Sequence, residues 1–209
     1  MPVAQPGLIF IATAILITGM LFYFGWMGFA WISLALTGFI TWFFRDPDRD
    51  IPKDEKGLIS PADGKVIVIE KQSVCEYLTG PCTKVSIFMN VFNVHVNRIP
   101  FDGTVQKIKY TPGKFINASF DKASVHNERN ALIVRTPDGA EYVVVQIAGL
   151  IARRIVNCVR EREKITKGDR YGMIRFGSRL DLYLPDDFDV AVHVGEKTKA
   201  GSTIIGYMK

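Results

Sequence analysis

The chain has 209 residues, with 26 lysines and arginines against 21 aspartates and glutamates, so its formal net charge is +5. None of these charged residues lies in 1–44, and residues 45–209 are enough for one compact domain with a core. The positive balance suits an anionic partner, for which we favour a membrane surface, because no RNP-like aromatic motif or basic run indicates nucleic acid. The three cysteines, Cys75, Cys82 and Cys158, contain no CxxC pair, which argues against a disulfide framework and a zinc site.

Residues 7–44 are continuously apolar, which is too long for a single span of about 20 residues. We therefore predict a hydrophobic hairpin over 1–44, with helices at 7–23 and 27–44 joined by a turn at Gly25. The basic n-region of a signal peptide is missing. The alternatives are one long tilted helix or a hairpin that enters only one leaflet.

Positive residues follow the apolar segment directly, namely Arg45, Arg49, Lys53 and Lys56. Because loops rich in lysine and arginine stay in the cytoplasm, the pattern predicts a cell-membrane protein whose second domain, 45–209, lies on the cytoplasmic side.

Beyond residue 57 the sequence changes to short runs rich in valine and isoleucine, separated by turn residues. We predict strands at 64–70, 84–92, 103–110, 131–136, 141–147, 178–184 and 189–194. Pro-Asp-Gly at 137–139 is typical of a hairpin. Only 149–160 has helical spacing, with Ile151, Ile155, Val156 and Val159 on one side. The expected fold is a mainly β, β-rich α+β, single catalytic domain preceded by the helical hairpin.

Four strings contain polar residues that the composition does not require: FFRDPDR (43–49), SPADG (60–64), NVHVNRIPFDG (93–103) and RYGMIRFGSRLDLYLP (170–185). Each has an ordinary explanation when taken alone. Asp63 fits a turn, His95 a packed core histidine and Ser178 the start of a strand. Arg153 and Arg154 would form a solvated helix face, and His193 is interpreted as structural.

The strings FFRDP, PADG, FNVHVNR, NERN, GLIARRI and RFGSRLDLYLP occur here in one order. This order, from the end of the apolar segment to the end of the chain, resembles the short-form phosphatidylserine decarboxylases. The resemblance implies a membrane-anchored enzyme that decarboxylates phosphatidylserine to phosphatidylethanolamine and CO2. It also implies that the proenzyme cuts itself at a Gly-Ser bond and makes a pyruvoyl group from the serine.

Two Gly-Ser bonds are candidates for this cleavage. Gly177-Ser178 follows a basic, aromatic strand and begins an apolar alternating one, as the cleaved bond of the family does, whereas Gly201-Ser202 would leave a very short product. We therefore predict a cut into chains 1–177 and 178–209. The two chains would stay together as a heterodimer, with further homo-oligomerisation left open.

The resemblance also assigns roles to side chains. Asp63 matches the aspartate that assists cleavage, and His95 matches one of two histidines that the long forms use for processing and decarboxylation. The second of those histidines is replaced by Arg98. His95 therefore serves one step or both, and His126 is the alternative base for processing.

The resemblance implies that the pyruvoyl group formed from Ser178 is the cofactor. Its ketone would condense with the substrate amine, and the resulting imine would delocalise the carbanion left when CO2 departs. Pyridoxal phosphate acts as the same kind of electron sink in other enzymes. No metal or nucleotide is implied, since neither a P-loop nor GxGxxG is present. Three alternatives remain: a decarboxylase of a related lipid such as archaetidylserine, a membrane-tethered lipid-binding β-domain that does not process itself, and a serine hydrolase. The last lacks a GxSxG elbow.

Overall fold

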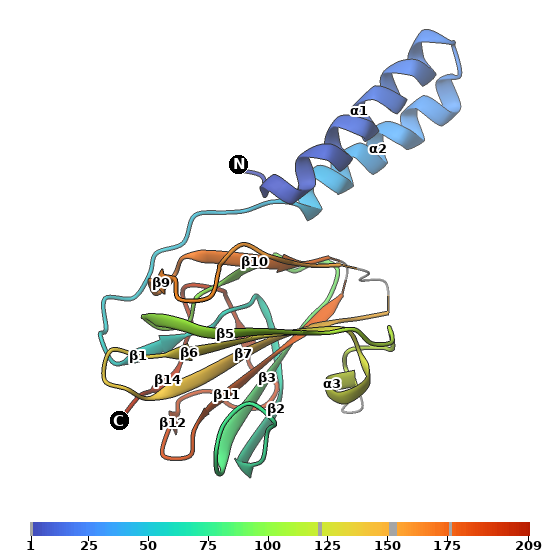
Figure 1. Cartoon of the computed structure of the whole chain (residues 1–209). Coiled ribbons are helices and arrows are strands. Elements are labelled where there is room, and N and C mark those ends of the chain that lie inside the picture. Colours follow the sequence, from blue (N-terminus) through green and yellow to red (C-terminus); the bar gives the residue numbers. More distant parts are fainter. Residues whose placement is uncertain (1, 121–122, 151–153, 176) are drawn as a thin grey trace. The chain divides into compact units, whose positions relative to one another are not determined.

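The computed structural model describes residues 2–120, 123–150, 154–175 and 177–209 and divides the chain into two compact units, Met1–Asp48 and Arg49–Lys209. Each unit is described by itself (Figure 1). The first unit contains η1 (Gln5–Gly7), α1 (Leu8–Tyr23) and α2 (Met27–Phe43). The second contains β1 (Gly57–Ile59), β2 (Gly64–Ser73), β3 (Cys82–Met89), β4 (Val96–Arg98), β5 (Gly103–Thr111), α3 (Ala123–His126), β6 (Arg129–Arg135), β7 (Glu141–Ala148), β8 (Ile155–Asn157), β9 (Lys164–Ile165), β10 (Arg170–Ile174), β11 (Ser178–Pro185), β12 (Asp189–Val190), β13 (Lys197–Thr198) and β14 (Ile204–Tyr207).

The first unit is the predicted pair of apolar helices. Gly25, with φ 74°, adopts the left-handed conformation in the turn between α1 and α2. Polar side chains join the helices midway, where the Thr18 hydroxyl lies 2.7 Å from the Ser33 hydroxyl and 3.0 Å from that of Thr37. These hydroxyls satisfy one another, so an otherwise apolar helix pair contains a specific polar contact.

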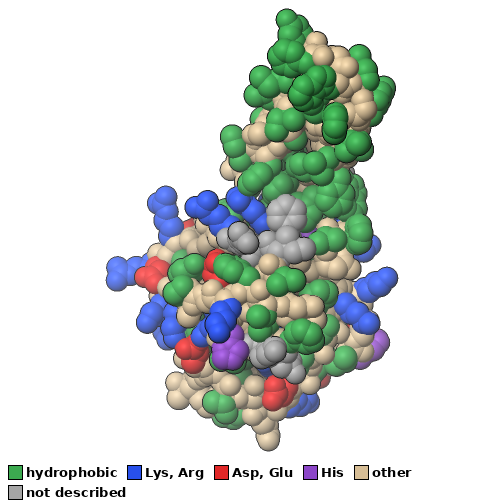
Figure 2. All heavy atoms as spheres, turned by 90° about the vertical axis from the view of Figure 1, so that its right-hand side faces the viewer, with side chains coloured by type: hydrophobic (Ala, Val, Ile, Leu, Met, Phe, Trp, Pro, Cys, Tyr) green, Lys and Arg blue, Asp and Glu red, His purple; other side chains and the backbone are tan. Residues whose placement is uncertain are grey.

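The helices expose most of their large apolar side chains, and Figure 2 shows the visible face of the pair covered by them, without charged groups. By length and composition, the segment Gln5–Tyr23 is apolar enough to cross a membrane, whereas Met27–Phe43 is a shorter apolar helix. Exposed apolar surface of this extent is typical of helices that contact a membrane or another apolar partner.

The second unit is built from antiparallel strands in three sheets. The largest has the order β13-β2-β3-β11-β7-β6-β5-β9, and the smaller ones are β4-β10-β8 and β1-β14-β12. Strand β11 lies in the middle of the large sheet, between β3 and β7 (Figure 1). The prediction of a mainly β domain after a helical hairpin is confirmed.

Alternating valine, isoleucine and leucine correctly predict β2, β3, β5, β6, β7 and β11. The run 189–194 is different, because only Asp189–Val190 forms a strand. After it the backbone turns: the N–H of His193 donates to the Glu196 carboxylate over 3.1 Å, and Gly195 has φ 97°. His193 is therefore an exposed turn residue and not part of an alternating strand.

The helix predicted over 149–160 is wrong where the chain is described. Residues 155–157 form β8, which pairs antiparallel with β10. The reason is that Ile155 lies opposite Ile174 and packs against the main core, while the pairing with β10 satisfies the backbone groups that a helix would have bonded internally. Arg154 therefore lies at a strand end, and the other parts of this prediction, 151–153, lie outside the described residues.

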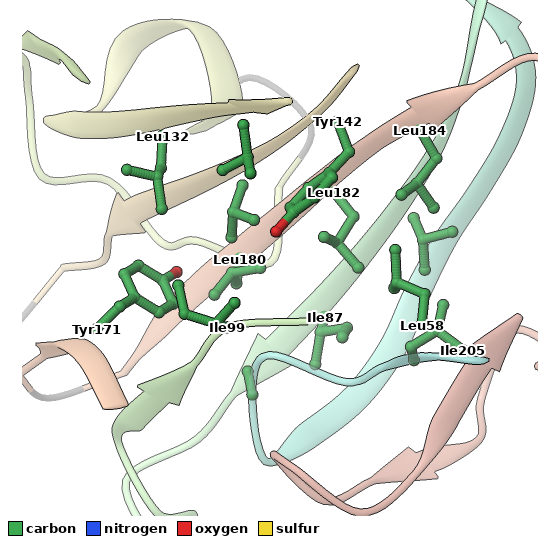
Figure 3. Packing of buried hydrophobic residues seen from close by; sticks show 14 of the residues in the cluster. Leu58, Ile87, Ile99, Leu132, Tyr142, Tyr171, Leu180, Leu182, Leu184 and Ile205 are labelled. Carbon is green, nitrogen blue, oxygen red and sulfur yellow. The ribbon is translucent and has the colours of Figure 1, made fainter. Parts of the chain in front are cut away.

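The main core lies between the sheets, where Leu180, Leu182 and Leu184 of β11 meet side chains from β1, β3, β7, β10 and β14 (Figure 3). The opposite face of β11 is covered as well, by a smaller apolar cluster to which Tyr183 contributes. Because both faces are covered, every side chain at the start of β11 is buried, including charged Arg179. The strand that begins with Ser178 is thus fixed in the interior.

Candidate active site

Ser178 is the first residue of β11 and is fully buried. It lies opposite Met89 of β3 and Ala148 of β7, and its hydroxyl contacts the Met89 sulfur over 3.9 Å. A sulfur is a weak acceptor, so this contact leaves the oxygen lone pairs of Ser178 available for other chemistry. The two neighbouring strands fix the position of the serine through their backbone ladders.

Gly177 has φ 65°, in the left-handed region that a residue with a side chain enters only with strain. Its N–H donates to Nε2 of His95 over 3.4 Å. The acceptor nitrogen of a neutral imidazole carries no proton, so Nε2 of His95 is a base at the N–H of Gly177, one peptide bond before the Gly177-Ser178 bond. The structure therefore brings two predicted site residues, His95 and Ser178, to either side of Gly177.

His95 is buried and precedes β4, which holds it in place. Val96 of β4 pairs with Met173 of β10, and the His95 carbonyl accepts a hydrogen bond from the Ile174 N–H over 3.4 Å. Because β10 leads directly to Gly177, the same strand positions both the imidazole and the Gly-Ser peptide.

Gly149 lies directly against the carbonyl of Gly177. A Cβ atom added at Gly149 would overlap the Gly177 carbonyl oxygen and lie 2.9 Å from its carbon. Only a glycine lets the end of β7 approach this carbonyl so closely. The sequence predicts Gly149 at the start of a helix and gives no sign of this contact.

Asp63 has a different environment. Its carboxylate accepts two hydrogen bonds from one guanidinium nitrogen of Arg49, over 3.0 and 2.8 Å, and one from the Ala200 N–H over 2.8 Å. Within the described residues these are the hydrogen bonds of the Asp63 side chain, and they include neither His95 nor Ser178. The carboxylate therefore ties the segment after the hairpin to the turn that contains Gly201 and Ser202.

The remaining predicted residues are spread over the domain. Arg98 is buried and donates to the Gly168 carbonyl over 2.8 Å. Ser202 is half-buried in the turn beside Asp63, and its N–H bonds to the Lys199 carbonyl. His126 is exposed at the end of α3, and the structure gives its side chain no hydrogen bond to Gly177 or Ser178 among the described residues.

A chain of buried polar side chains leads to the serine and was not predicted. The Gln146 amide donates to Asn97 over 2.9 Å, and Asn97 in turn contacts the sulfur of Met89 over 3.7 Å. Asn127 donates to the Ala148 carbonyl over 2.7 Å, which fixes the residue opposite Ser178. The string NERN was the only signal of Asn127 in the sequence.

Arg179 and Asp181 form a buried ion pair on the other face of β11. Arg179 Nε donates to Asp181 over 2.6 Å, and a second nitrogen donates to the Ser86 hydroxyl of β3 over 2.9 Å. Both side chains are fully shielded from solvent, so removing one partner would leave an uncompensated charge in the interior. Through Arg179 the pair links the first residues of β11 to Ser86 of β3.

Two further arginines, Arg154 and Arg175, face each other at the ends of β8 and β10, where the Arg175 N–H donates to the Arg154 carbonyl over 3.4 Å. Arg175 is half-buried at the end of β10, and Arg154 is exposed before β8. Burial, and then the positive charge of Arg154, lower the pKa of Arg175 from its ordinary value.

A buried serine at the start of a central strand follows a left-handed glycine whose N–H donates to a buried histidine. Comparison with known proteins identifies the family. A family model described as phosphatidylserine decarboxylase matches residues 36–206. The chain therefore belongs to the phosphatidylserine decarboxylase family, and the resemblance found in the sequence is confirmed.

Several similar proteins are named phosphatidylserine decarboxylase proenzyme. The protein of Syntrophus aciditrophicus is 57% identical over 85% of this chain and 84% of its own length. That of Desulfotalea psychrophila is 49% identical over 98% and 96%, and that of Burkholderia vietnamiensis 47% over 99% and 96%. The similarity thus includes the helical unit as well as the β domain.

Proposed function

We propose that this protein is a phosphatidylserine decarboxylase, which forms phosphatidylethanolamine and CO2 after it has cut its own chain between Gly177 and Ser178. The observation that carries the proposal is the Gly177-Ser178 peptide itself. It combines a left-handed glycine and a buried serine hydroxyl, and the N–H of that glycine, one peptide bond earlier, donates to an imidazole nitrogen of His95. The products of the cut are chains 1–177 and 178–209.

The cut needs only groups of the chain and one water molecule. The Ser178 hydroxyl attacks the Gly177 carbonyl carbon, and the amide becomes an ester as the proton moves to the Ser178 nitrogen. Loss of the Ser178 α-proton then breaks the Cβ–O bond, which releases the Gly177 carboxylate and leaves dehydroalanine. Water converts this residue to a pyruvoyl group with release of ammonia.

His95 is the proposed base for these reaction steps, because its unprotonated Nε2 already accepts the N–H of Gly177. Asp63 is the proposed assisting carboxylate, on the strength of its match to the family motif. In the structure the Asp63 carboxylate is paired with Arg49, so a role in cleavage requires it to act through the turn that it holds or after this pair rearranges.

The residues around Ser178 suit a pyruvoyl group. The group would begin β11, between the ladders of β3 and β7, with Met89 beside it and no acidic side chain among the described hydrogen bonds of Ser178. It would supply an electron sink for decarboxylation. The chain's own task is to hold residue 178 fixed, and His95 is placed to donate or accept a proton there.

We also propose that the helical unit inserts into the cell membrane and that the β domain works on the cytoplasmic side. The proposal is supported by the apolar exposed surface of α1 and α2. Arg45 at the end of α2 lies over the Trp42 ring, 3.9 Å from its centre, as an interfacial arginine and tryptophan would.

The test is the intact mass of purified protein under denaturing conditions. Wild-type protein is expected to give two chains, with the smaller beginning at a blocked residue 178, and Ser178→Ala is expected to give one uncut, inactive chain near 23.4 kDa. Ser202→Ala is the matched control and should be cut and active. A Ser178→Ala protein that is still cut would contradict the assignment.

A further inference from the structure

Three buried carboxamides and a thioether form a chain that ends at Ser178. Asn130 donates to the side-chain oxygen of Gln146 over 3.4 Å, and Gln146 donates to that of Asn97 over 2.9 Å. The Asn97 amide donates to the Met89 sulfur over 3.7 Å, and the Ser178 hydroxyl donates to the same sulfur over 3.9 Å. All five residues are buried. One sulfur atom therefore joins the amide of Asn97 to the hydroxyl that is proposed to attack.

The sulfur fixes the direction of the hydrogen bonds in this chain. A thioether has no proton to donate, so the NH2 group of Asn97, and not its oxygen, faces Met89. The Asn97 oxygen then faces Gln146, which must turn its own NH2 group toward Asn97. Each of these two carboxamides is thus held in a single orientation, with its N–H groups directed along the chain toward the sulfur.

Gly172 of β10 leaves room for the Gln146 side chain. A Cβ atom added at Gly172 would lie 2.9 Å from the side-chain nitrogen of Gln146, closer than side chains pack. Gly172 also lies opposite Asn97 in the pairing of β10 with β4. A glycine at this position therefore allows Gln146 of β7 to reach Asn97 across the interior.

We infer that Asn97 is a positioning residue for self-cleavage, an inference that rests on the proposed function. A methionine side chain has three rotatable bonds and adapts its position readily. The N–H of Asn97 restricts the Met89 sulfur to one position, and the sulfur in turn orients the Ser178 hydroxyl. Because a thioether is a weak acceptor, it orients this hydroxyl without retaining its proton, which a base must remove before the oxygen attacks.

The test compares self-cleavage of the full-length protein with Met89→Leu, Asn97→Ala and the double change. Met89→Leu approximately keeps the volume of the side chain and removes the acceptor. The control is Met208→Leu, at a half-buried methionine near the end of the chain that packs against the main core. Time courses on denaturing gels measure the rates. We expect each single change to slow the cut about tenfold, the effect of one hydrogen bond, and Met208→Leu to leave the rate unchanged.

The double variant separates positioning from a merely structural effect of Asn97. Since Asn97 acts through the Met89 sulfur, the double change should slow the cut by about tenfold and no more, because the atom that Asn97 positions is already gone. Two independent structural effects would multiply to about a hundredfold. That result, or a Met89→Leu protein that is cut at the wild-type rate, would overturn the inference.

Urea unfolding of the same changes in the uncut Ser178→Ala protein checks that each variant folds. If Asn97→Ala does not unfold cooperatively, the comparison of Met89→Leu with Met208→Leu decides alone, since both replace a methionine by a residue of similar volume. A wild type that is not cut would refute the proposed function. A wild type that is cut, with variants that are cut equally fast, would refute only the role of Asn97.

Discussion

At the scale of single residues, the position of Asp63 separates two accounts of the cut. Its match to the family motif gives it a role in processing, whereas its hydrogen bonds in the structure go to Arg49 and Ala200. A substitution of Asp63 alone would affect both a direct role in cleavage and the contacts with Arg49 and Ala200. A substitution of Arg49 is therefore needed to separate the two.

We expect Asp63→Asn to slow chain cleavage about 10²- to 10⁴-fold, the range for loss of a positioned acid–base group, while molecules that do mature decarboxylate normally. Arg49→Gln removes the same ion pair but keeps the carboxylate, and it should slow cleavage far less. Time courses of cleavage on denaturing gels measure both. Equal slowing in the two variants would mean that Asp63 acts only by holding the turn at Ala200.

The His95 imidazole accepts the N–H of Gly177, the residue whose carbonyl is proposed to be attacked, so His95→Ala should leave most of the chain uncut. The same range of about 10²- to 10⁴-fold applies, because Nε2 of His95 is a base that the structure places at the Gly177 N–H. If His95→Ala is cut normally but inactive, His95 serves decarboxylation alone and His126 becomes the processing base. A variant with normal rates in both steps would remove His95 from the site.

A sequence motif can single out a residue such as Ser178, whose role stays a prediction, but it gives no sign of partners that are far apart in the chain. The string RFGSRLDLYLP led to Ser178, and the structure gives its glycine the special backbone expected of such a site. The pairing of Asp63 with Ala200 had no such signal, because it depends on how distant turns pack. The contact between Gln146 and Asn97 is a product of tertiary structure in the same way.

At the scale of elements, the end of β7 and the start of β11 meet at Gly149 and Gly177. Gly149→Ala should push the Gly177 carbonyl away from its present position, because the added methyl group would overlap the carbonyl oxygen. We expect cleavage to be slowed at least tenfold, and the overpacking to lower stability by about 1–3 kcal/mol. Intact mass over time and urea unfolding of the uncut protein measure the two effects.

The control is Gly139→Ala in the exposed turn between β6 and β7. A Cβ there meets no atom within 4 Å, although φ is 90°. This change should lower stability through backbone strain without affecting cleavage. Similar cleavage rates in Gly149→Ala and wild type would show that the close approach is not required.

Elements were predictable where side-chain alternation extends over a whole strand. Strand β8 was not, since three residues provide too little alternation, and the spacing of Ile151, Ile155 and Val159 also fits a helix. Pairing with β10 decides the conformation of Ile155–Asn157. The shortened strand at Asp189–Val190 has a local cause instead, the turn at Gly195.

At the scale of the whole molecule, the absence of charge in 1–44 predicted the helix pair, and the alternating runs predicted the β domain. How the helical unit is used remains a proposal. Deleting residues 1–44 should release the β domain from the integral-membrane fraction, because the large exposed apolar surface of α1 and α2 is lost. Binding to anionic vesicles should remain and disappear at high salt, since it would rest on the net charge of +5 alone.

Vesicle sedimentation at low and high salt measures this change, with detergent extraction of the full chain as the reference. Retention of the truncated protein on vesicles at high salt would show that another apolar surface anchors it. Soluble full-length protein without detergent would contradict membrane insertion of the hairpin altogether.

The central place of β11 has a consequence for how the protein can be made. Its neighbours β3 and β7 both precede the proposed cut, and β13 and β14 pair with β2 and β1, which precede it as well. Before cleavage these pairings form within one polymer, as a first-order process. Once the bond is broken, denatured protein must reassemble from two separate peptides at a rate that depends on their concentration, in competition with aggregation. The uncut chain can thus fold as a single polymer, and this route is lost after cleavage. The mature enzyme therefore depends on having folded before it was cut.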